Sequence, residues 1–415
     1  MQRPPLEVAD IFRDFGPVWL EANRGHVSHA QLKVMNAILA CRTAALGGYV
    51  ARCENPECAH TVIAYASCRN RHCPKCQGCQ ALAWMEKRKA ELLQVPYFHI
   101  VFTLPTEIGA IASQNKAEIY GLLFKAASET MLTIAGDPKH LGAKIGITAV
   151  MHTWGSAMIH HPHVHMIVTG GGISPDGLRW IASQPDYLVP VEVLSALFRG
   201  RMLGMLIDAH AGGRLKFFGK YEHLADSNAF RAYLGPLWTT DWFVYAKRPF
   251  AGPEQVLAYL SRYTHRVAIS NSRLISADAS GVTFKYKDYR IEGPERYTTM
   301  TLEPAEFIRR FLMHVLPKGF HRIRHYGLLA NGRAKRAEKL ARARQLIAAA
   351  PQLAPPPQQQ PPHTGTCQDT NLPQHLDHPC PHCGCRMAII EVFAAGCRPR
   401  HRPSAPALII GINSS

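Results

Sequence analysis

The stretch "HHPHVHMIVTGGG", residues 160–172, decides the fold that we expect, because it combines histidines with a pattern typical of a β-strand. Successive side chains of a strand point to opposite faces of the sheet. His163 and His165 are therefore predicted to share one face, while Val164 and Met166 point the other way, into a core. Two neighbouring imidazoles on a rigid strand would form a clamp for a metal ion. The alternative interpretation is a pair of surface or hydrogen-bonded histidines.

The composition indicates a globular protein with a polyanionic partner. The chain has 415 residues, enough for two or three domains, and 47% of them are hydrophobic. Lysine and arginine number 47 against 30 acidic residues, a formal net charge of +17, which favours binding to nucleic acid or to an anionic membrane surface. The N-terminal sequence lacks the apolar run of a signal peptide, and no stretch reaches the roughly 18 apolar residues of a spanning helix. We therefore expect a soluble, cytoplasmic, nucleoid-associated protein that binds DNA and no membrane.

Twelve cysteines fall largely into two clusters whose spacings are typical of zinc sites, and no export signal favours disulfides instead. The first cluster is "CENPECAHTVIAYASCRNRHCPKCQGC", residues 53–79. Two close thiolate pairs can form a closed tetrahedral site that stabilises a small domain, which we place at residues 1–95. The expected zinc ligands are Cys53, Cys58, Cys73 and Cys76. Surplus candidates are Cys68, His72 and Cys79, whereas Cys41 is interpreted as a core thiol.

Basic side chains lie among the cysteines of the first cluster. With the large positive net charge, they favour contacts with DNA phosphates over a merely solvated surface, and the residues expected to make these contacts are Arg69, Arg71 and Lys75.

The rest of the chain mixes predicted strands and helices. Helical segments are expected near residues 81–94 and 116–134, and apolar, β-branched runs predict strands at 96–105, 144–155, 163–172 and 281–290. This order predicts an α+β fold over residues 96–330, with a central, largely antiparallel sheet and flanking helices.

The C-terminal part has three predicted segments. A basic helical extension at residues 331–348 precedes a proline- and glutamine-rich linker at 349–363. The last segment, 364–415, is expected to be poorly ordered. Its Cys380 and Cys383 form one half of a zinc ribbon, and the candidates for the other half are Cys367, Cys385 and Cys397.

An amphipathic helix is predicted over residues 252–268. Gly252-Pro253 is typical of a helix start, and an apolar stripe follows it. Tyr259 and Tyr263 are one turn apart and so lie on the same face. Core packing is the alternative role for Tyr263.

These features occur in the order of three motifs of the HUH endonucleases: a strand ending in "FTLP", a strand with His-x-His and a helix with Tyr-x-x-x-Tyr. Further matching motifs are "SCRNRHCPKCQ", "HTWGSAMIHHPHVH", "YLSRYTHRVAISN" and "RHYGLLAN". With them the chain resembles insertion-sequence-91-type rolling-circle transposases from about residue 15 to about residue 345. The first zinc pair departs from the family, because four residues separate Cys53 from Cys58 in place of the usual two.

The resemblance implies a transposase that nicks single-stranded or hairpin DNA at the ends of an insertion sequence and joins it to target DNA. Tyr259 and Tyr263 would be the nucleophiles, each forming a 5′-phosphotyrosine and releasing a 3′-OH. A divalent ion, Mg²⁺ or Mn²⁺, would be held by His163 and His165. Arg262 and Arg266 flank the tyrosines and would contact the DNA backbone.

The third ligand of the divalent ion depends on strand pairing. If residues 144–155 form a hairpin with the His-x-His strand, His152 reaches the ion. The alternatives are His160, His161 or a residue after position 263.

Two other functions remain as alternatives. A rolling-circle replication initiator would use the same nicking chemistry, although the zinc-binding segment and the "HYGLLAN" motif favour a transposase. A non-catalytic, zinc-dependent DNA-binding protein would leave the histidines and tyrosines without a role. A metalloprotease is disfavoured because the chain lacks His-Glu-x-x-His.

Overall fold

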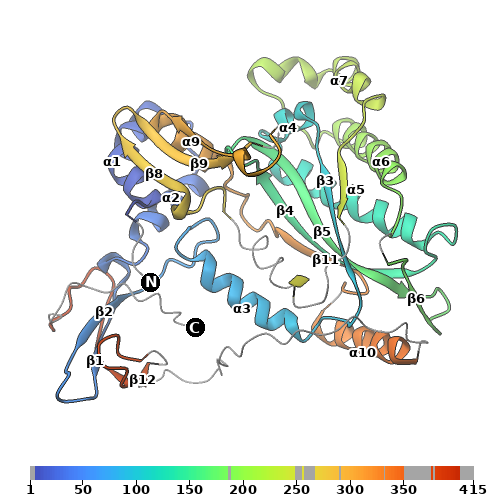
Figure 1. Cartoon of the computed structure of the whole chain (residues 1–415). Coiled ribbons are helices and arrows are strands. Elements are labelled where there is room, and N and C mark those ends of the chain that lie inside the picture. Colours follow the sequence, from blue (N-terminus) through green and yellow to red (C-terminus); the bar gives the residue numbers. More distant parts are fainter. Residues whose placement is uncertain are drawn as a thin grey trace.

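The computed structural model describes residues 5–185, 188–247, 255–256, 267–288, 291–330, 332–349, 375–376 and 379–401 (Figure 1). Helices and antiparallel sheets make up these residues, which confirms the predicted α+β class. Within the same ranges, no helix combines the length and the apolar character needed to span a membrane.

The α-helices are α1 (Val8–Ala22), α2 (His29–Ala40), α3 (Gln77–Lys89), α4 (Thr106–Ala112), α5 (Lys116–Gly136), α6 (Val191–Ala211), α7 (Ser227–Leu234), α9 (Pro304–Met313) and α10 (Arg333–Ala349). Short 3₁₀-helices lie at Ala44–Leu46, Gly219–Ala225, Gly235–Trp238, Asn271–Arg273 and Pro294–Arg296. The strands are β1 (Gly48–Cys53), β2 (Thr61–Tyr65), β3 (Tyr97–Thr103), β4 (Lys144–Trp154), β5 (His160–Ile173), β6 (Trp180–Ala182), β7 (Val244–Lys247), β8 (Leu274–Asp278), β9 (Gly281–Lys287), β10 (Tyr297–Leu302), β11 (Ile323–Gly327), β12 (His375–Leu376) and β13 (Met387–Phe393).

Most predicted elements match observed ones. The strands expected at 96–105, 144–155 and 163–172 are β3, β4 and β5, and the basic extension is α10. The helix expected at 81–94 begins earlier, at Gln77, and ends at Lys89. Of the predicted helix at 252–268, the structure describes residues 255–256, which are helical, and 267–268, which are not.

The central sheet has the strand order β11-β4-β5-β3-β7, with β6 added beside β5. One face packs against α4, α5 and α6 (Figure 1), and it carries Val164, Met166 and Val168, as the period-two alternation predicts. The helices can bury this face because the strands present a continuous apolar surface to them. The opposite face carries His163 and His165, and α10 packs on part of it.

A smaller hydrophobic cluster lies on the face of the sheet that carries the histidines. Leu340 of α10 and Leu93, just before β3, belong to it, together with Ile167 of β5. Val256 is fully buried in the same cluster. The part of the sheet that carries the histidines lies beside this cluster, because Ile167 follows His165 on the same face.

The N-terminal helices share a core with a later part of the chain. α1 and α2 pack with α9 and with the three-stranded sheet β10-β9-β8, and Phe12 meets Phe311 edge to face at a ring-centroid distance of 5.3 Å. Cys73 and Cys76 belong to the same hydrophobic cluster. Residues before 95 therefore do not form a separate core.

A third sheet joins the two ends of the chain, in the order β12-β13-β1-β2. β13 pairs antiparallel with β1, from Gly48 opposite Phe393 to Cys53 opposite Met387 (Figure 1). The expectation of a poorly ordered tail is therefore wrong for residues 379–401. Met387 and Phe393 of β13 are buried in two small clusters with residues of β1 and β2.

Candidate metal centre and cysteine clusters

Three histidines meet on the face of the central sheet opposite the packed helices, where His152 is buried and His163 and His165 are half-buried. The register places His152 of β4 opposite His163 of β5, and His165 is two positions farther along the same face. One ring nitrogen from each of the three lies within 4.8 Å of the others. The ring centroids of His163 and His165 are 4.8 Å apart, and those of His152 and His165 are 4.6 Å apart. β4 and β5 therefore form the hairpin on which the prediction of His152 as the third ligand depended.

A fourth histidine, His99 of β3, supports this group, and sequence reasoning missed it. Nε2 of His99 lies 2.9 Å from Nδ1 of His165, and the two rings are stacked with an interplanar angle of 8°. His99 is opposite Ile167 in the β3–β5 ladder, so it shares the face of His165. Its position as the lone histidine of an apolar strand was the available signal.

The protonation of these histidines suits metal binding. Burial lowers the pKa of His99 and of His163 to about 4, so both rings are neutral at pH 7. Nδ1 of His163 is 2.6 Å from the carbonyl oxygen of His161. A proton on that Nδ1 donates to the carbonyl and makes Nε2 the ligating atom. If Nδ1 of His165 carries the shared proton, it donates to Nε2 of neutral His99, and Nε2 of His165 is then the ligating atom.

The three imidazoles fit a divalent transition metal. Metal–nitrogen bonds are about 2.1 Å long, so two nitrogens on one ion are at most about 4.2 Å apart. The three ligand nitrogens lie within 4.8 Å of one another, close to that limit. Three nitrogen ligands favour Mn²⁺ over Mg²⁺ intrinsically, because Mg²⁺ prefers oxygen ligands.

Trp154 connects this centre to the N-terminal region. Its indole stacks on His152 with a centroid distance of 4.7 Å and an interplanar angle of 17°. Trp154 also belongs to the hydrophobic cluster that contains Cys73 and Cys76. The packing around these cysteines can therefore affect the orientation of His152.

The expected zinc ligands do not form one site. Cys73 and Cys76 lie with Cys41 and Cys68, whereas Cys53 and Cys58 lie with Cys380 and Cys383. The prediction of a single Cys53–Cys58–Cys73–Cys76 site is therefore wrong, and Cys41 is not an isolated core thiol. The reason is that β1 and β2 carry the first pair away from the turn at residues 68–76, toward the C-terminal hairpin.

The first cysteine group has the geometry of a tetrahedral zinc site. Sγ of Cys76 lies 3.5 Å from Sγ of Cys41 and 3.7 Å from Sγ of Cys68. Zinc–sulfur bonds of about 2.3 Å place tetrahedral ligands about 3.8 Å apart, and a disulfide would need about 2.05 Å. Backbone N–H groups also point at the sulfurs, and the N–H of Asn70 donates to Cys68 Sγ at 3.5 Å.

Comparison with known proteins now places the chain in a family. Residues 11–104 match the model of the transposase zinc-binding domain, and residues 146–338 match a model described as "Putative transposase". A putative transposase of Sinorhizobium fredii, y4qJ, is 56% identical over 347 residues, which cover 84% of this chain and 85% of the relative. The chain belongs to the insertion-sequence-91 family of transposases.

Two further proteins resemble this transposase less closely. The transposase of insertion sequence element IS801 from Pseudomonas savastanoi pv. phaseolicola is 27% identical over 321 residues, covering 74% of this chain and 72% of the relative. Among solved structures, the conjugative relaxase TrwC in complex with oriT DNA matches 60% of this chain and 73% of its own, with 14% identity and a TM-score of 0.23. That likeness is too weak to carry an argument.

The basic residues near the first cysteine group already have partners within the transposase. Arg71 donates to the carbonyl oxygens of Phe320 and Pro317 at 2.5 and 3.0 Å, and Lys75 forms a 2.9 Å ion pair with Glu7. The carbonyl oxygen of Arg69 accepts from Gln80. The DNA contacts expected of Arg69, Arg71 and Lys75 stay predictions.

The surplus ligand candidates have different outcomes. Cys68 joins the first cysteine group. Nε2 of the buried His72 accepts the backbone N–H of Leu316 at 3.4 Å instead, and the side chain of Cys79 lies outside the described residues. Tyr259, Tyr263, Arg262 and Arg266 also lie outside the described residues.

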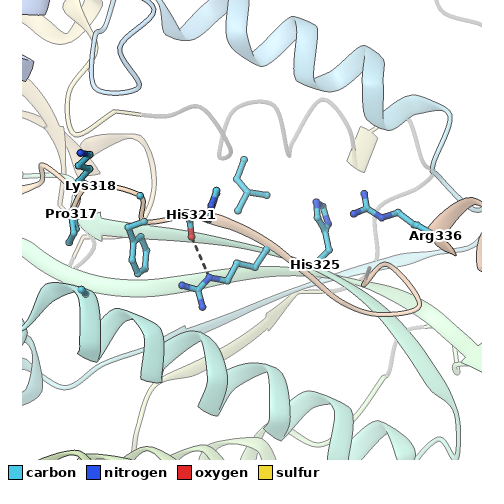
Figure 2. A pocket seen from close by; sticks show the side chains of 10 residues that line it. Pro317, Lys318, His321, His325 and Arg336 are labelled. Atoms are coloured by element: carbon cyan, nitrogen blue, oxygen red, sulfur yellow. Dashed lines mark hydrogen bonds between the residues drawn. The ribbon is translucent and has the colours of Figure 1, made fainter. Parts of the chain in front are cut away.

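A basic pocket of about 560 Å³ lies at the edge strand β11 of the transposase (Figure 2). His321, Arg324 and His325 line it from β11 and the preceding loop, and Arg336 lines it from α10. Arg324 and His325 are successive residues of β11, so their side chains point to opposite sides of the strand. The guanidinium of Arg324 lies 4.3 Å from the ring centroid of Phe124, and Arg336 pairs with Glu91 at 3.1 Å. The sequence signal for this pocket was the motif "RHYGLLAN".

Proposed function

We propose that this transposase is a metal-dependent endonuclease that nicks single-stranded DNA at the ends of an insertion sequence through a 5′-phosphotyrosine. The observation that carries the proposal is the convergence of His152, His163 and His165 on one sheet face, with His99 beside His165. These residues lie within segments that match the transposase family models.

The histidines would position a divalent ion against the scissile phosphate. When bound, such an ion polarises the phosphate and neutralises the charge that develops during attack. His99 would hold the ring of His165, and the carbonyl of His161 would hold the ring of His163. The three neutral imidazoles leave the remaining coordination positions to oxygen ligands from DNA.

A tyrosine would supply the nucleophile. The hydroxyl loses its proton as its oxygen attacks phosphorus, the bond from phosphorus to the 3′ oxygen breaks, and the released 3′ oxygen takes up a proton to become a 3′-OH. Tyr259 and Tyr263 are the candidates. Val256, three positions before Tyr259, is buried with Ile167 on the face that carries the histidines. The nearest described residue on the N-terminal side of Tyr259 therefore lies on the correct side of the sheet.

The DNA would be bound chiefly through its phosphates. The net charge of +17 favours a polyanion, and the pocket at β11 adds basic groups beside β4, which carries His152. A second tyrosine would allow two successive transesterifications, one at the donor end and one at the target, as rolling-circle transposition requires.

The experiment uses a labelled single-stranded oligonucleotide from each end of the element that encodes the chain. With Mn²⁺ or Mg²⁺, we expect a covalent protein–DNA adduct on a denaturing gel, and EDTA should prevent it. His163→Ala should abolish the adduct. His161→Ala is the matched control, because the exposed His161 side chain is outside the ligand group and its carbonyl remains. An undiminished adduct in His163→Ala would refute the proposed role of this residue.

A further inference from the structure

The geometry points to a second structural zinc site, in which Cys53 and Cys58 from the N-terminal region bind the same ion as Cys380 and Cys383 from the C-terminal hairpin. Neither C-terminal cysteine falls within the segments that match the family models, 11–104 and 146–338. This site does not depend on the nicking activity proposed above.

The sulfur positions fit one tetrahedral ion. Sγ of Cys53 lies 3.4 Å from Sγ of Cys383, and Sγ of Cys58 lies 3.8 Å from Sγ of Cys380. Tetrahedral zinc–thiolate geometry requires about 3.8 Å, whereas a disulfide requires about 2.05 Å. Both short distances join one chain end to the other, so neither pair forms its site alone.

The backbone holds the two pairs in place. Cys53 is the last residue of β1 and lies opposite Met387 of β13, and the N–H of Glu54 donates to the carbonyl of Arg386 at 3.0 Å. Cys53 and Cys380 are 4% and 3% exposed. Four thiolates packed this closely need a cation, because their mutual repulsion would otherwise force them apart or keep them protonated.

Both pairs end in the tight turn that directs N–H groups toward thiolates. Ala59 directly follows Cys58 and has φ of 43°, and Gly384 directly follows Cys383 and has φ of 75°. The backbone N–H of His60 donates to Cys58, and that of Cys385 donates to Cys383. The first cysteine group repeats the arrangement, because Arg42 and Arg69 follow Cys41 and Cys68 with φ of 57° and 50°. A left-handed alanine is unusual, so the local structure must hold it there.

The four cysteines and their zinc ion form a zinc clamp that joins distant parts of the chain. Cys58 and Cys380, for example, are 322 positions apart. The clamp holds β13 beside β1 and thereby attaches the C-terminal hairpin to the N-terminal region of the transposase. Four thiolates select zinc or iron, and a redox-inactive ion suits a structural clamp.

The test is the zinc content of the purified full-length chain, measured by elemental analysis. We expect two zinc ions per chain, and one in either Cys53→Ser or Cys380→Ser. The double variant should also retain one, because both residues serve the same ion. Cys397→Ser is the control and should retain two, because Cys397 is exposed and outside both groups. A wild-type content of one zinc, a Cys380→Ser variant with two, or iron in place of zinc would overturn the proposal.

Thiol alkylation gives a second readout on the wild-type protein, in case a variant fails to fold. Mass spectrometry should show that Cys53 and Cys380 are protected from iodoacetamide together and become reactive together as a chelator removes zinc. Cys397 should react from the start. If Cys380 reacts as fast as Cys397 before chelation, the clamp is refuted.

Discussion

His99 lies directly behind His165, with 2.9 Å between Nε2 of the first and Nδ1 of the second. The contact crosses from β3 to β5, so the pairing of two strands sets the orientation of a predicted metal ligand. His99 is 3% exposed, and burial lowers its pKa to about 4, which keeps the ring neutral and able to accept a hydrogen bond from His165. A buried partner of this kind fixes both the tautomer and the ring angle of a ligand.

Replacing His99 should weaken metal binding without removing a ligand. We expect His99→Phe to raise the Kd for Mn²⁺ about 10- to 100-fold, because His165 loses its hydrogen-bond partner while the ring volume is kept. His99→Gln, which retains a hydrogen-bonding group, should recover part of the affinity. Isothermal titration with Mn²⁺ measures both. Equal affinities for His99→Phe and the wild type would show that the contact has no orienting role.

The alternation along β5 predicts opposite effects for neighbouring residues. His163→Ala should leave the chain folded and lose the covalent DNA adduct, since His163 faces away from the core. Val164 is fully buried, so Val164→Asp should destabilise the fold by about 4 kcal/mol or more through an unpaired buried charge. Urea unfolding followed by circular dichroism measures the second effect. Similar unfolding midpoints for the two variants would contradict the assignment of faces.

If Tyr259 and Tyr263 are both nucleophiles, single and double variants should differ in whether they form the DNA adduct. Tyr259→Phe and Tyr263→Phe each lose one hydroxyl, so packing should hardly change. If both are nucleophiles, each single variant should still form an adduct with single-stranded DNA, the double variant should form none, and transposition in cells should fail for every variant. Peptide mapping of the adduct locates the phosphorylated residue. Normal transposition by Tyr263→Phe would assign that residue to packing alone.

Acid should destabilise the fold through His314. This buried side chain interacts with the hydroxyl of Thr153 and the carbonyl of Met158, and burial lowers its pKa to about 3. Between pH 6.5 and pH 3 the unfolded chain binds a proton here that the folded chain does not. Stability is therefore complete above pH 6.5 and is lost as the pH falls, by at most about 1.4 kcal/mol per pH unit. Urea titrations at pH 5 and pH 6 give the change of the unfolding free energy per pH unit. This change should be smaller in His314→Gln by the contribution of His314. An equal change in His314→Gln and the wild type would exclude His314 as its source.

Loss of the first cysteine group should affect more than the N-terminal region. Cys73 is fully buried in the cluster formed by α1, α2, α9 and the β8–β10 sheet. We expect Cys73→Ser to lose one zinc and to lower the thermal unfolding temperature, with increased hydrogen exchange in both α1 and α9. The exposed Cys397→Ser serves again as the control. Increased exchange confined to residues 68–76 would mean that zinc supports only its own turn.

The sequence alone determined the features that depend on local periodicity. Period-two alternation was enough to place His163 and His165 on one face and Val164 on the other, because alternation is a property of the strand itself. Apolar runs likewise located β3, β4 and β5. The residue types also predicted which ions could bind, since imidazole and thiolate prefer particular metals wherever the chain brings them together.

Only the tertiary structure decided which of these side chains meet. Sequence spacing joined Cys58 to Cys73 because they are close along the chain, but the pairing of β1 with β13 carries Cys58 to Cys380 instead. The contact of His99 with His165 likewise depends on the β3–β5 register, and the approach of His152 on the register of β4. A ligand group brings together residues that are distant along the chain. Which residues meet depends on strand pairing and core packing, and no local sequence pattern encodes these.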